Sequence, residues 1–198
     1  MKRPAGPAGP VGIVLAGGAS LRMGRDKARI ELSGETLAAS AARRLAAVCS
    51  EVALADAGRR LHPALPSLPD GPGRGPAAGL LGAAARYPGR SLLALACDLP
   101  RVPVPLLAEL ARSTEGADWA VPRWDRGIEP LCALWGPRAL ALLAARVEQG
   151  LHALWPLAEI GPEEGLAVRW LEGDLLASFG APGELFLNVN TPEDLARL

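Results

Sequence analysis

Short apolar runs alternate with stretches of helical periodicity along the whole chain, and this alternation restricts the fold more than any other feature. The most continuous run, SLLALAC at residues 91–97, predicts a central strand that is buried on both faces. Strands of that kind belong to parallel sheets whose two faces are covered by helices. The sequence therefore predicts α/β class: one three-layer α/β/α domain around an open, mostly parallel sheet.

The same periodicities give approximate bounds for each element. We expect strands at residues 11–16, 52–55, 91–97, 117–121, 131–135, 166–171 and 185–189, and helices at 36–48, 77–86, 103–112, 137–147 and 192–198. Ligand sites in open sheets gather at the carboxyl ends of the strands. The polar clusters that follow the predicted strands are therefore the first candidates for a site.

Length and charge exclude several classes of partner. At 198 residues the chain fits a single domain, and we expect a flexible tail at 1–10 followed by the domain at 11–198. The 21 basic and 21 acidic residues balance, which argues against nucleic-acid and membrane partners. The apolar run at 11–16 is too short for a signal peptide or membrane span, so we expect a cytoplasmic protein.

Cysteine usage agrees with that location. Cys49, Cys97 and Cys132 are odd in number, widely spaced and without a CxxC pattern, so they predict neither a zinc site nor a disulfide framework. We interpret them as small buried side chains in a reducing compartment.

The thirteen residues LAGGASLRMGRDK directly follow the first predicted strand. Gly17 and Gly18 allow the backbone to approach a ligand closely and to direct its N–H groups at phosphate oxygens. Arg22, Arg25 and Lys27 add three positive charges, and Lys27 is one of only two lysines in the chain. The pattern is neither GxGxxG nor a P-loop. It predicts a triphosphate site of another kind, in preference to a surface turn with solvated charges.

A second cluster, DGPGRGPAAG, begins at Asp70 and leads into a predicted helix. The free N–H groups of a helix start can face an anion or a base edge, and Asp70 can accept hydrogen bonds from a nucleobase or a ribose. A surface loop followed by a helix start explains the segment equally well.

The third cluster is CDLP, at the end of the most apolar strand. A carboxylate there, Asp98, is well placed to hold Mg²⁺, which would bridge phosphate oxygens. The alternative is an aspartate that only caps the following turn.

The only two asparagines of the chain form the fourth cluster. Asn188 and Asn190 alternate along the last predicted strand, so their side chains are expected on the same side, as a second polar arm for substrate or metal. The residues TPED that follow are explained by a helix N-cap with proline in the first turn.

Other polar residues carry weaker signals. The segment EPLC, from Glu129 to Cys132, either lines an acceptor side of the site or simply begins an edge strand, where proline is tolerated. His62 and His152 have no partner spacing, and we interpret them as surface or packing residues.

The motifs LAGGASLRMGRDK, DGPGRGPAAG, CDLP and NVNTPEDL occur in this order over essentially the whole chain. The set resembles the molybdenum cofactor guanylyltransferases. The resemblance implies a Rossmann-like nucleotidyltransferase fold and transfer of GMP from GTP to molybdenum-bearing molybdopterin, with pyrophosphate leaving. Close relatives of that family use CTP on the same cofactor, and more distant ones act on sugar or polyol phosphates.

The resemblance also implies roles for single residues. The main chain of Leu15, Ala16 and Gly17 matches the part of the family that binds guanine and ribose. Lys27 matches the motif lysine of the family, Asp70 its loop aspartate and Asp98 its Mg²⁺-binding aspartate. Asn188 and Asn190 fall where the family approaches the pterin substrate and the metal. With Gly18 from the same loop, these are the expected binding residues.

The expected chemistry needs no general base, because the attacking phosphate of molybdopterin is already an anion. Positioning and charge stabilisation then carry the reaction. We expect Asp98 to hold Mg²⁺ at the α-phosphate, and Lys27 and Arg22 to stabilise the triphosphate and the departing pyrophosphate.

One position departs from the family. An asparagine that some members use for the nucleotide would fall near Ala55, and the adjacent polar residue is Asp56. A CTP-dependent enzyme, a sugar-phosphate nucleotidyltransferase and a nucleotide-binding carrier or adaptor in cofactor delivery therefore remain alternatives. The resemblance also allows transient contact with proteins that insert or accept the cofactor.

Overall fold

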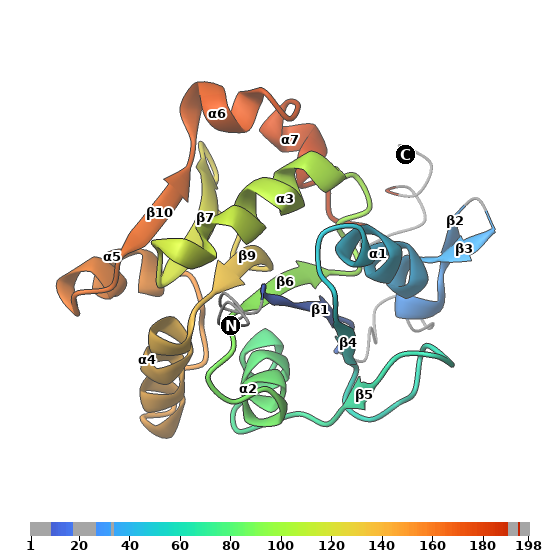
Figure 1. Cartoon of the computed structure of the whole chain (residues 1–198), viewed down its shortest axis with the longest axis horizontal. Coiled ribbons are helices and arrows are strands. Elements are labelled where there is room, and N and C mark those ends of the chain that lie inside the picture. Colours follow the sequence, from blue (N-terminus) through green and yellow to red (C-terminus); the bar gives the residue numbers. More distant parts are fainter. Residues whose placement is uncertain (1–8, 18–26, 33, 190–193, 195–198) are drawn as a thin grey trace, which may run out of the picture.

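A computed structural model describes residues 9–17, 27–32, 34–189 and 194 of the chain. They form a central sheet between two layers of helices, which confirms the predicted three-layer α/β/α class (Figure 1). Most of the expected tail at 1–10, and all of the expected helix at 192–198 except residue 194, lie outside the described residues.

The sheet runs in the order β10-β7-β9-β6-β1-β4-β5, with β8 paired to β7, and a separate hairpin joins β2 and β3. The strands are β1 Val11–Leu15, β2 Glu31–Leu32, β3 Glu35–Thr36, β4 Val52–Ala55, β5 Ser67–Leu68, β6 Leu92–Ala96, β7 Trp119–Trp124, β8 Gly127–Ile128, β9 Cys132–Trp135 and β10 Val168–Leu171. The β1–β4, β1–β6, β4–β5 and β7–β10 pairs are parallel.

Helices cover both faces of the sheet, as the apolar runs predict (Figure 1). They are α1 Leu37–Ala46, α2 Pro76–Arg86, α3 Val104–Arg112, α4 Pro137–Glu148, α5 Leu157–Glu163, α6 Gly173–Ala177 and α7 Pro182–Leu185. One apolar cluster lies between the sheet and α1 and α3, and the other lies between the sheet and α2, α4 and α5. The alternate side chains of β1 divide between them, with Val14 in the first and Ile13 in the second.

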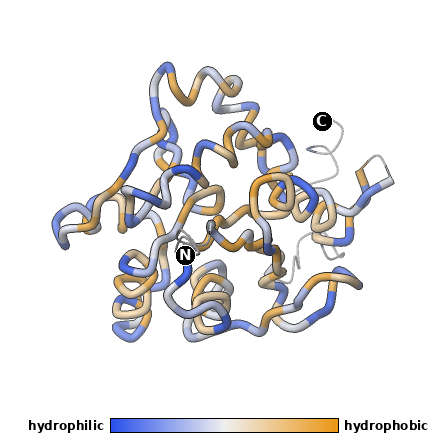
Figure 2. The backbone as a smooth tube through the Cα atoms, viewed as in Figure 1, coloured by the Kyte–Doolittle hydropathy of each residue, from blue (hydrophilic) through white to orange (hydrophobic). Residues whose placement is uncertain are grey.

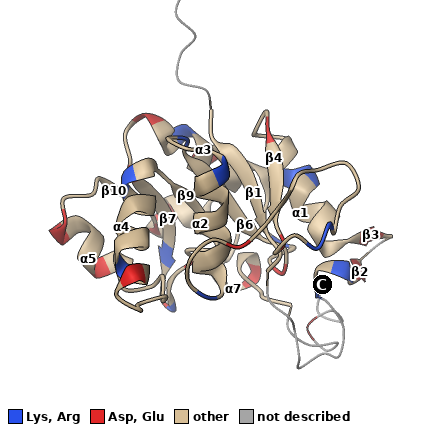
Figure 3. Ribbon diagram, turned by 90° about the horizontal axis from the view of Figure 1, so that it is seen from below, with Lys and Arg blue, Asp and Glu red and all other residues tan. Residues whose placement is uncertain are grey.

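The central strands carry no charged residue. β1, β4 and β6 are tan throughout in Figure 3, and the hydropathy of the same segments is high in Figure 2. All five residues of β1 and all five of β6 are buried. Because both faces of these strands are covered, their polar neighbours appear only where the strands end. Among the described residues, no helix has the length and apolar content that crossing a membrane requires.

The predicted strand at 185–189 is wrong. Helix α7, Pro182–Leu185, occupies its beginning, and residues 187–189 form no strand. The side chains of Leu185, Phe186 and Val189 are buried in the cluster beneath α1 and α3 without joining the sheet. A short apolar run reports burial, and it does not distinguish a strand from other buried segments.

The direction and position of β9 also differ from the sequence interpretation. β9 is antiparallel to both of its neighbours, β6 and β7, so it lies inside the sheet and is not an edge strand. Its reversed direction brings its amino end to the carboxyl end of β6, where the N–H of Ala96 donates to the carbonyl of Leu131 at 2.8 Å. The EPLC segment therefore lies at the same edge of the sheet as CDLP.

Candidate functional site

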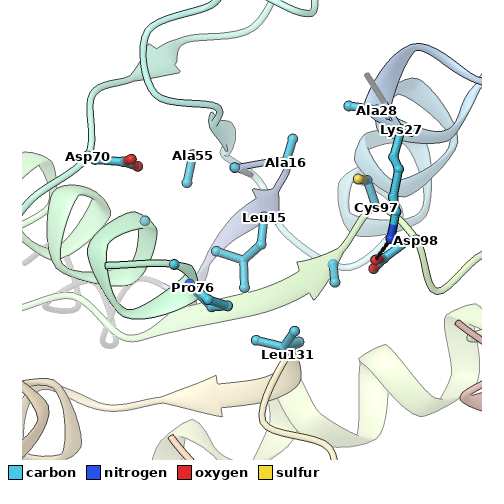
Figure 4. A pocket seen from close by; sticks show the side chains of 14 residues that line it. Leu15, Ala16, Lys27, Ala28, Ala55, Asp70, Pro76, Cys97, Asp98 and Leu131 are labelled. Carbon is cyan, nitrogen blue, oxygen red and sulfur yellow. Dashed lines mark ion pairs between the residues drawn. The ribbon is translucent and has the colours of Figure 1, made fainter. Parts of the chain in front are cut away.

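A cavity of about 250 Å³ opens at the carboxyl ends of β1, β4 and β6 (Figure 4). Six of the residues singled out from the sequence line it, although they come from four separate segments: Leu15, Ala16, Gly17, Lys27, Asp70 and Asp98. In Figure 4 the carboxyl group of Asp70 lies at one side of the cavity, with Lys27 and Asp98 at the other. The cavity thus has two separate polar ends.

The end of β1 is held by hydrogen bonds of its own main chain. The N–H of Ala16 donates to the carbonyl of Ala55 at 3.0 Å, and the carbonyl of Leu15 accepts from the N–H of Cys97 at 3.1 Å. The guanidinium of Arg59 donates to the carbonyl of Ala16. The Ala16 amide is therefore already committed within the protein, and the carbonyls of Leu15 and Ala16 each accept one hydrogen bond.

Asp70 is positioned by a close contact between its loop and α2. The N–H of Gly71 donates to the carbonyl of Ala78 at 2.8 Å. A Cβ atom on Gly82 would lie 2.2 Å from the carbonyl oxygen of Pro69, and one on Gly71 would lie 2.5 Å from the nitrogen of Gly82. Two glycines are therefore required for this approach, and it turns the exposed Asp70 carboxylate toward Gly17.

Asp98 follows β6 and faces Lys27. The Nζ atom of Lys27 lies 3.7 Å from Oδ2 of Asp98, and each side chain is 20% exposed. Burial raises the pKa of the Asp98 carboxyl above its ordinary value, and the positive charge of Lys27 opposes that rise. A second positive charge nearby would lower this pKa and stabilise the ionised carboxylate. Lys27 itself lies in a 3-10 turn, Lys27–Arg29.

Glu129 is a second carboxylate near this end of the cavity, and the sequence left its role open. It is partly buried between β8 and β9, where its N–H donates to the carbonyl of Pro122 at 3.0 Å. Burial raises the pKa of its carboxyl to about 7, although the N–H of Leu131 lowers it, and the charge of Asp98 raises it further. The antiparallel direction of β9 is what brings Glu129 close to Asp98.

Asp56, the residue beside the missing family asparagine, has a structural role. Its side chain is fully buried and accepts hydrogen bonds from the hydroxyl of Ser67 at 2.5 Å and the N–H of Leu61 at 2.9 Å. Its two oxygens therefore bind the loop that follows β4 and the start of β5, and Asp56 is not among the residues that line the cavity.

The predicted asparagine pair is only partly described. Asn188 is exposed and does not line the cavity, but the N–H of its neighbour Val189 donates to the carbonyl of Asp98 at 2.9 Å. The segment therefore reaches the Asp98 loop without the strand that was expected to present it. Asn190, and the loop residues Gly18, Arg22 and Arg25, lie outside the described residues.

Sequence reasoning covered the apolar part of the wall only in part. It consists of small or apolar side chains, among them Ala28, Ala55, Pro76, Gly79, Ala96 and Leu131. Pro76 and Gly79 lie in the DGPGRGPAAG motif and Ala55 at the family's asparagine position, whereas Ala28 and Ala96, which ends β6, were not singled out. Leu131 belongs to the EPLC segment, whose place on the acceptor side the sequence left open, and the reversed direction of β9 brings it to the wall.

The donor set fits a magnesium ion that is shared with phosphates. Among the described residues there is no group of three or more His, Cys, Asp or Glu side chains that could hold a metal by itself. Mg²⁺ is commonly bound by only one or two carboxylates, with substrate phosphates and water completing its shell. Asp98, whose carboxyl group lies in the cavity wall, meets that requirement.

Residues 12–159, which include every described cavity residue, match the family model described as the MobA-like NTP transferase domain. The chain belongs to the MobA-like NTP transferase family. Membership makes it a nucleotidyltransferase, and the nucleotide-binding alternative without enzymatic activity is thereby disfavoured.

Individual relatives of this MobA-like chain agree in length. A protein named molybdenum cofactor guanylyltransferase from Cereibacter sphaeroides is 36% identical over 194 residues, 94% of this chain and 93% of that protein. The solved molybdopterin-guanine dinucleotide biosynthesis protein A from Archaeoglobus fulgidus is 26% identical, with a TM-score of 0.66 and coverage of 94% and 95%.

A manganese complex of a Mycobacterium tuberculosis protein shares the fold, with 20% identity, a TM-score of 0.65 and coverage of 96% of this chain and 98% of that one. The predicted Rossmann-like nucleotidyltransferase fold is thus confirmed for this MobA-like chain.

Proposed function

We propose that this chain transfers GMP from GTP to molybdopterin that carries molybdenum, with Mg²⁺ as cofactor and pyrophosphate as the second product. The observation that carries the proposal is the cavity in which Lys27, Asp70 and Asp98 meet the end of β1. The names of the relatives, molybdenum cofactor guanylyltransferase among them, supply the acceptor.

The two polar ends of the cavity suit the two ends of a nucleotide. Guanosine lies along Leu15, Ala16 and Gly17, where Asp70 accepts hydrogen bonds from the base or ribose. The triphosphate extends toward Lys27 and Asp98, with the amide of Gly18 and the side chain of Arg22 contributing from the first loop. Small wall residues such as Ala55 and Gly79 leave room for the planar base.

The acceptor approaches from the side of the C-terminal segment. Asn188 and Asn190 bind the pterin substrate in this proposal, and the hydrogen bond from Val189 to Asp98 supports it, because it holds that segment against the cavity wall. The cofactor phosphate then attacks the α-phosphorus in line with the leaving pyrophosphate.

Catalysis rests on positioning and on charge. Asp98 holds Mg²⁺, which when bound offsets negative charge on the phosphate oxygens. Lys27 leaves Asp98 and donates to the triphosphate, and with Arg22 it stabilises the departing pyrophosphate. The attacking phosphate is an anion already, so none of the cavity side chains has to remove a proton.

Pyrophosphate release tests the proposal. The purified chain is assayed with GTP, CTP or ATP, with and without Mg²⁺, and with molybdenum-loaded molybdopterin or a sugar phosphate as acceptor. Release should require GTP, Mg²⁺ and molybdopterin together. Faster release with CTP would indicate a cytidylyltransferase, and release with a sugar phosphate would indicate a different acceptor class. Tight GTP binding without release would instead support a carrier.

The remaining parts of the proposal follow from this reaction. We propose that residues 11–198 make up the catalytic domain and that the enzyme works in the cytoplasm. Its small-molecule partners are GTP and molybdopterin, and it meets cofactor-inserting or acceptor proteins only transiently. It requires neither nucleic acid nor a membrane.

A further inference from the structure

Arg44 is a buried arginine in α1 that the proposed reaction does not use. It is 6% exposed and lies on the side of α1 that faces the apolar cluster beneath α1 and α3. Within the described parts of the chain, its guanidinium has no carboxylate at ion-pair distance, and its Nη2 atom has no hydrogen-bond partner. Burial lowers its pKa below the ordinary arginine value. Such a group is costly to bury, so its contacts need an explanation.

The contacts of Arg44 fall on the turn that follows Asp98. Its Nη1 atom donates to the carbonyls of Leu99 and Val102, both at 2.9 Å, while its Nε atom donates to Ser40 within α1 at 3.3 Å. Leu99 and Val102 are each 1% exposed, so water cannot replace these hydrogen bonds. One guanidinium therefore joins both ends of the turn to α1.

This turn has few other donors for those carbonyls. Pro100 and Pro103 have no N–H group, and the N–H of Val102 reaches the carbonyl of Leu99 only at 3.5 Å. The planar arrangement of guanidinium donors is suited to such a task, because one rigid group can bind two acceptors at fixed positions. The ammonium group of lysine lacks that geometry.

Asp98 is the residue immediately before this turn. On its other side, the N–H of Cys97 donates to the carbonyl of Leu15, and the carbonyl of Asp98 itself accepts from Val189 at 2.9 Å. These bonds and those of Arg44 fix the backbone on both sides of Asp98. We infer that Arg44 is a positioning residue, which sets the direction in which the Asp98 carboxylate enters the cavity. The inference rests on the proposed function, because it assigns Asp98 to the metal.

The test compares four variants of the full chain with the wild type. Arg44→Met removes the donors and keeps the length, whereas Arg44→Lys keeps a cation. Arg43→Met is the matched control, because Arg43 is the next residue of α1 and is exposed, where it pairs with Glu35. Leu45→Ala controls for lost stability, since Leu45 is fully buried in the same helix and cluster.

The first readout is hydrogen exchange of the segment 97–102 and of the Val189 amide, without metal or nucleotide. Arg44→Met should accelerate exchange there by about tenfold beyond Leu45→Ala, and Arg44→Lys by a smaller factor. Equal exchange in Arg44→Met and Leu45→Ala would overturn the positioning role. If Arg44→Met does not fold, wild-type exchange in Arg44→Lys overturns it.

The second readout is binding of Mn²⁺, followed by electron paramagnetic resonance with GTP present. Loss of a residue that orients a metal ligand typically weakens binding by about 10–100-fold. Arg44→Met should raise the half-saturating Mn²⁺ concentration at least tenfold, and the two controls should stay within about twofold of wild type. If the wild type binds Mn²⁺ through Asp98, an unchanged half-saturating Mn²⁺ concentration in Arg44→Met would contradict the inference. A wild type without GTP-dependent pyrophosphate release contradicts the proposed function alone, because the exchange readout does not depend on it.

Discussion

Nζ of Lys27 and Oδ2 of Asp98 are 3.7 Å apart, although 70 residues lie between them in the sequence, because β1 and β6 are parallel neighbours and the segments after them meet at one edge of the sheet. This ion pair joins the only described cation of the cavity wall to the carboxylate that is proposed to hold the metal. Each side chain is available for exchange with a ligand, because a triphosphate attracts the ammonium group and a divalent cation attracts the carboxylate. The ion pair therefore holds both charged groups, each only partly exposed, at the cavity wall where a substrate binds.

Removal of either partner should abolish most of the activity and leave the fold intact. We expect Asp98→Ala and Lys27→Ala each to lower kcat/KM for GTP by about two to three orders of magnitude, equivalent to ~2.7–4 kcal/mol. Pyrophosphate release measures the rate, and circular dichroism checks the fold. Arg43→Ala, which removes an exposed ion pair, is the control and should retain wild-type activity. Wild-type turnover in Asp98→Ala would refute the metal assignment.

Glu129 should make the metal-free protein less stable as the pH rises. Burial raises its pKa from 4.5 to about 7 in the folded protein, so the folded state binds this proton more tightly than the unfolded state. The stabilisation is complete below about pH 4.5 and is lost as the pH rises through 7. Glu129→Gln should therefore be more stable than wild type at pH 8, by on the order of 3 kcal/mol.

Urea denaturation at pH 4.5 and pH 8, without nucleotide or metal, measures this difference. Glu163→Gln, an exposed change on α5, should keep the pH dependence of the wild type. A Glu129→Gln protein whose stability relative to wild type is the same at both pH values would show that the carboxyl is not perturbed by burial.

The close approach of the Asp70 loop to α2 should not tolerate a methyl group. In Gly82→Ala the new Cβ would lie 2.2 Å from the carbonyl oxygen of Pro69, so the loop has to move. We expect a loss of stability of about 1–3 kcal/mol and a higher KM for GTP, because Asp70 moves with the loop. Gly116→Ala is the control, since a Cβ there would meet nothing within 4 Å. Unchanged melting temperature and KM in Gly82→Ala would contradict this prediction.

Asp56 should affect stability and not nucleotide choice. Asp56→Ala leaves the half-buried hydroxyl of Ser67 and the N–H of Leu61 without their acceptor, which should cost on the order of 1–3 kcal/mol. The ratio of GTP to CTP turnover should stay at the wild-type value at a temperature where the variant is folded. A changed ratio would mean that Asp56 reaches the base after all.

Much of the site could be predicted from local sequence, because its polar residues follow buried strands. Gly17 lies two residues after the end of β1 and Asp98 two residues after the end of β6, and parallel neighbours bring such ends to one edge of a sheet. Asn188 shows the limit of this reasoning. Its segment is apolar enough for a strand, but the side chains of Phe186 and Val189 are buried against other elements, and the segment pairs with none of the strands.

The sequence by itself determined the buried strands, the helices with their alternating apolar faces, and the four motifs that mark the family. These properties depend on residues that are close together in the chain. The tertiary structure decided that β9 runs antiparallel inside the sheet, which brings Leu131 to the cavity wall and Glu129 near Asp98, and that Arg44 binds the turn after Asp98. Apolar periodicity reports that a side chain is buried, but strand direction and the partner of a buried charge depend on contacts between distant segments.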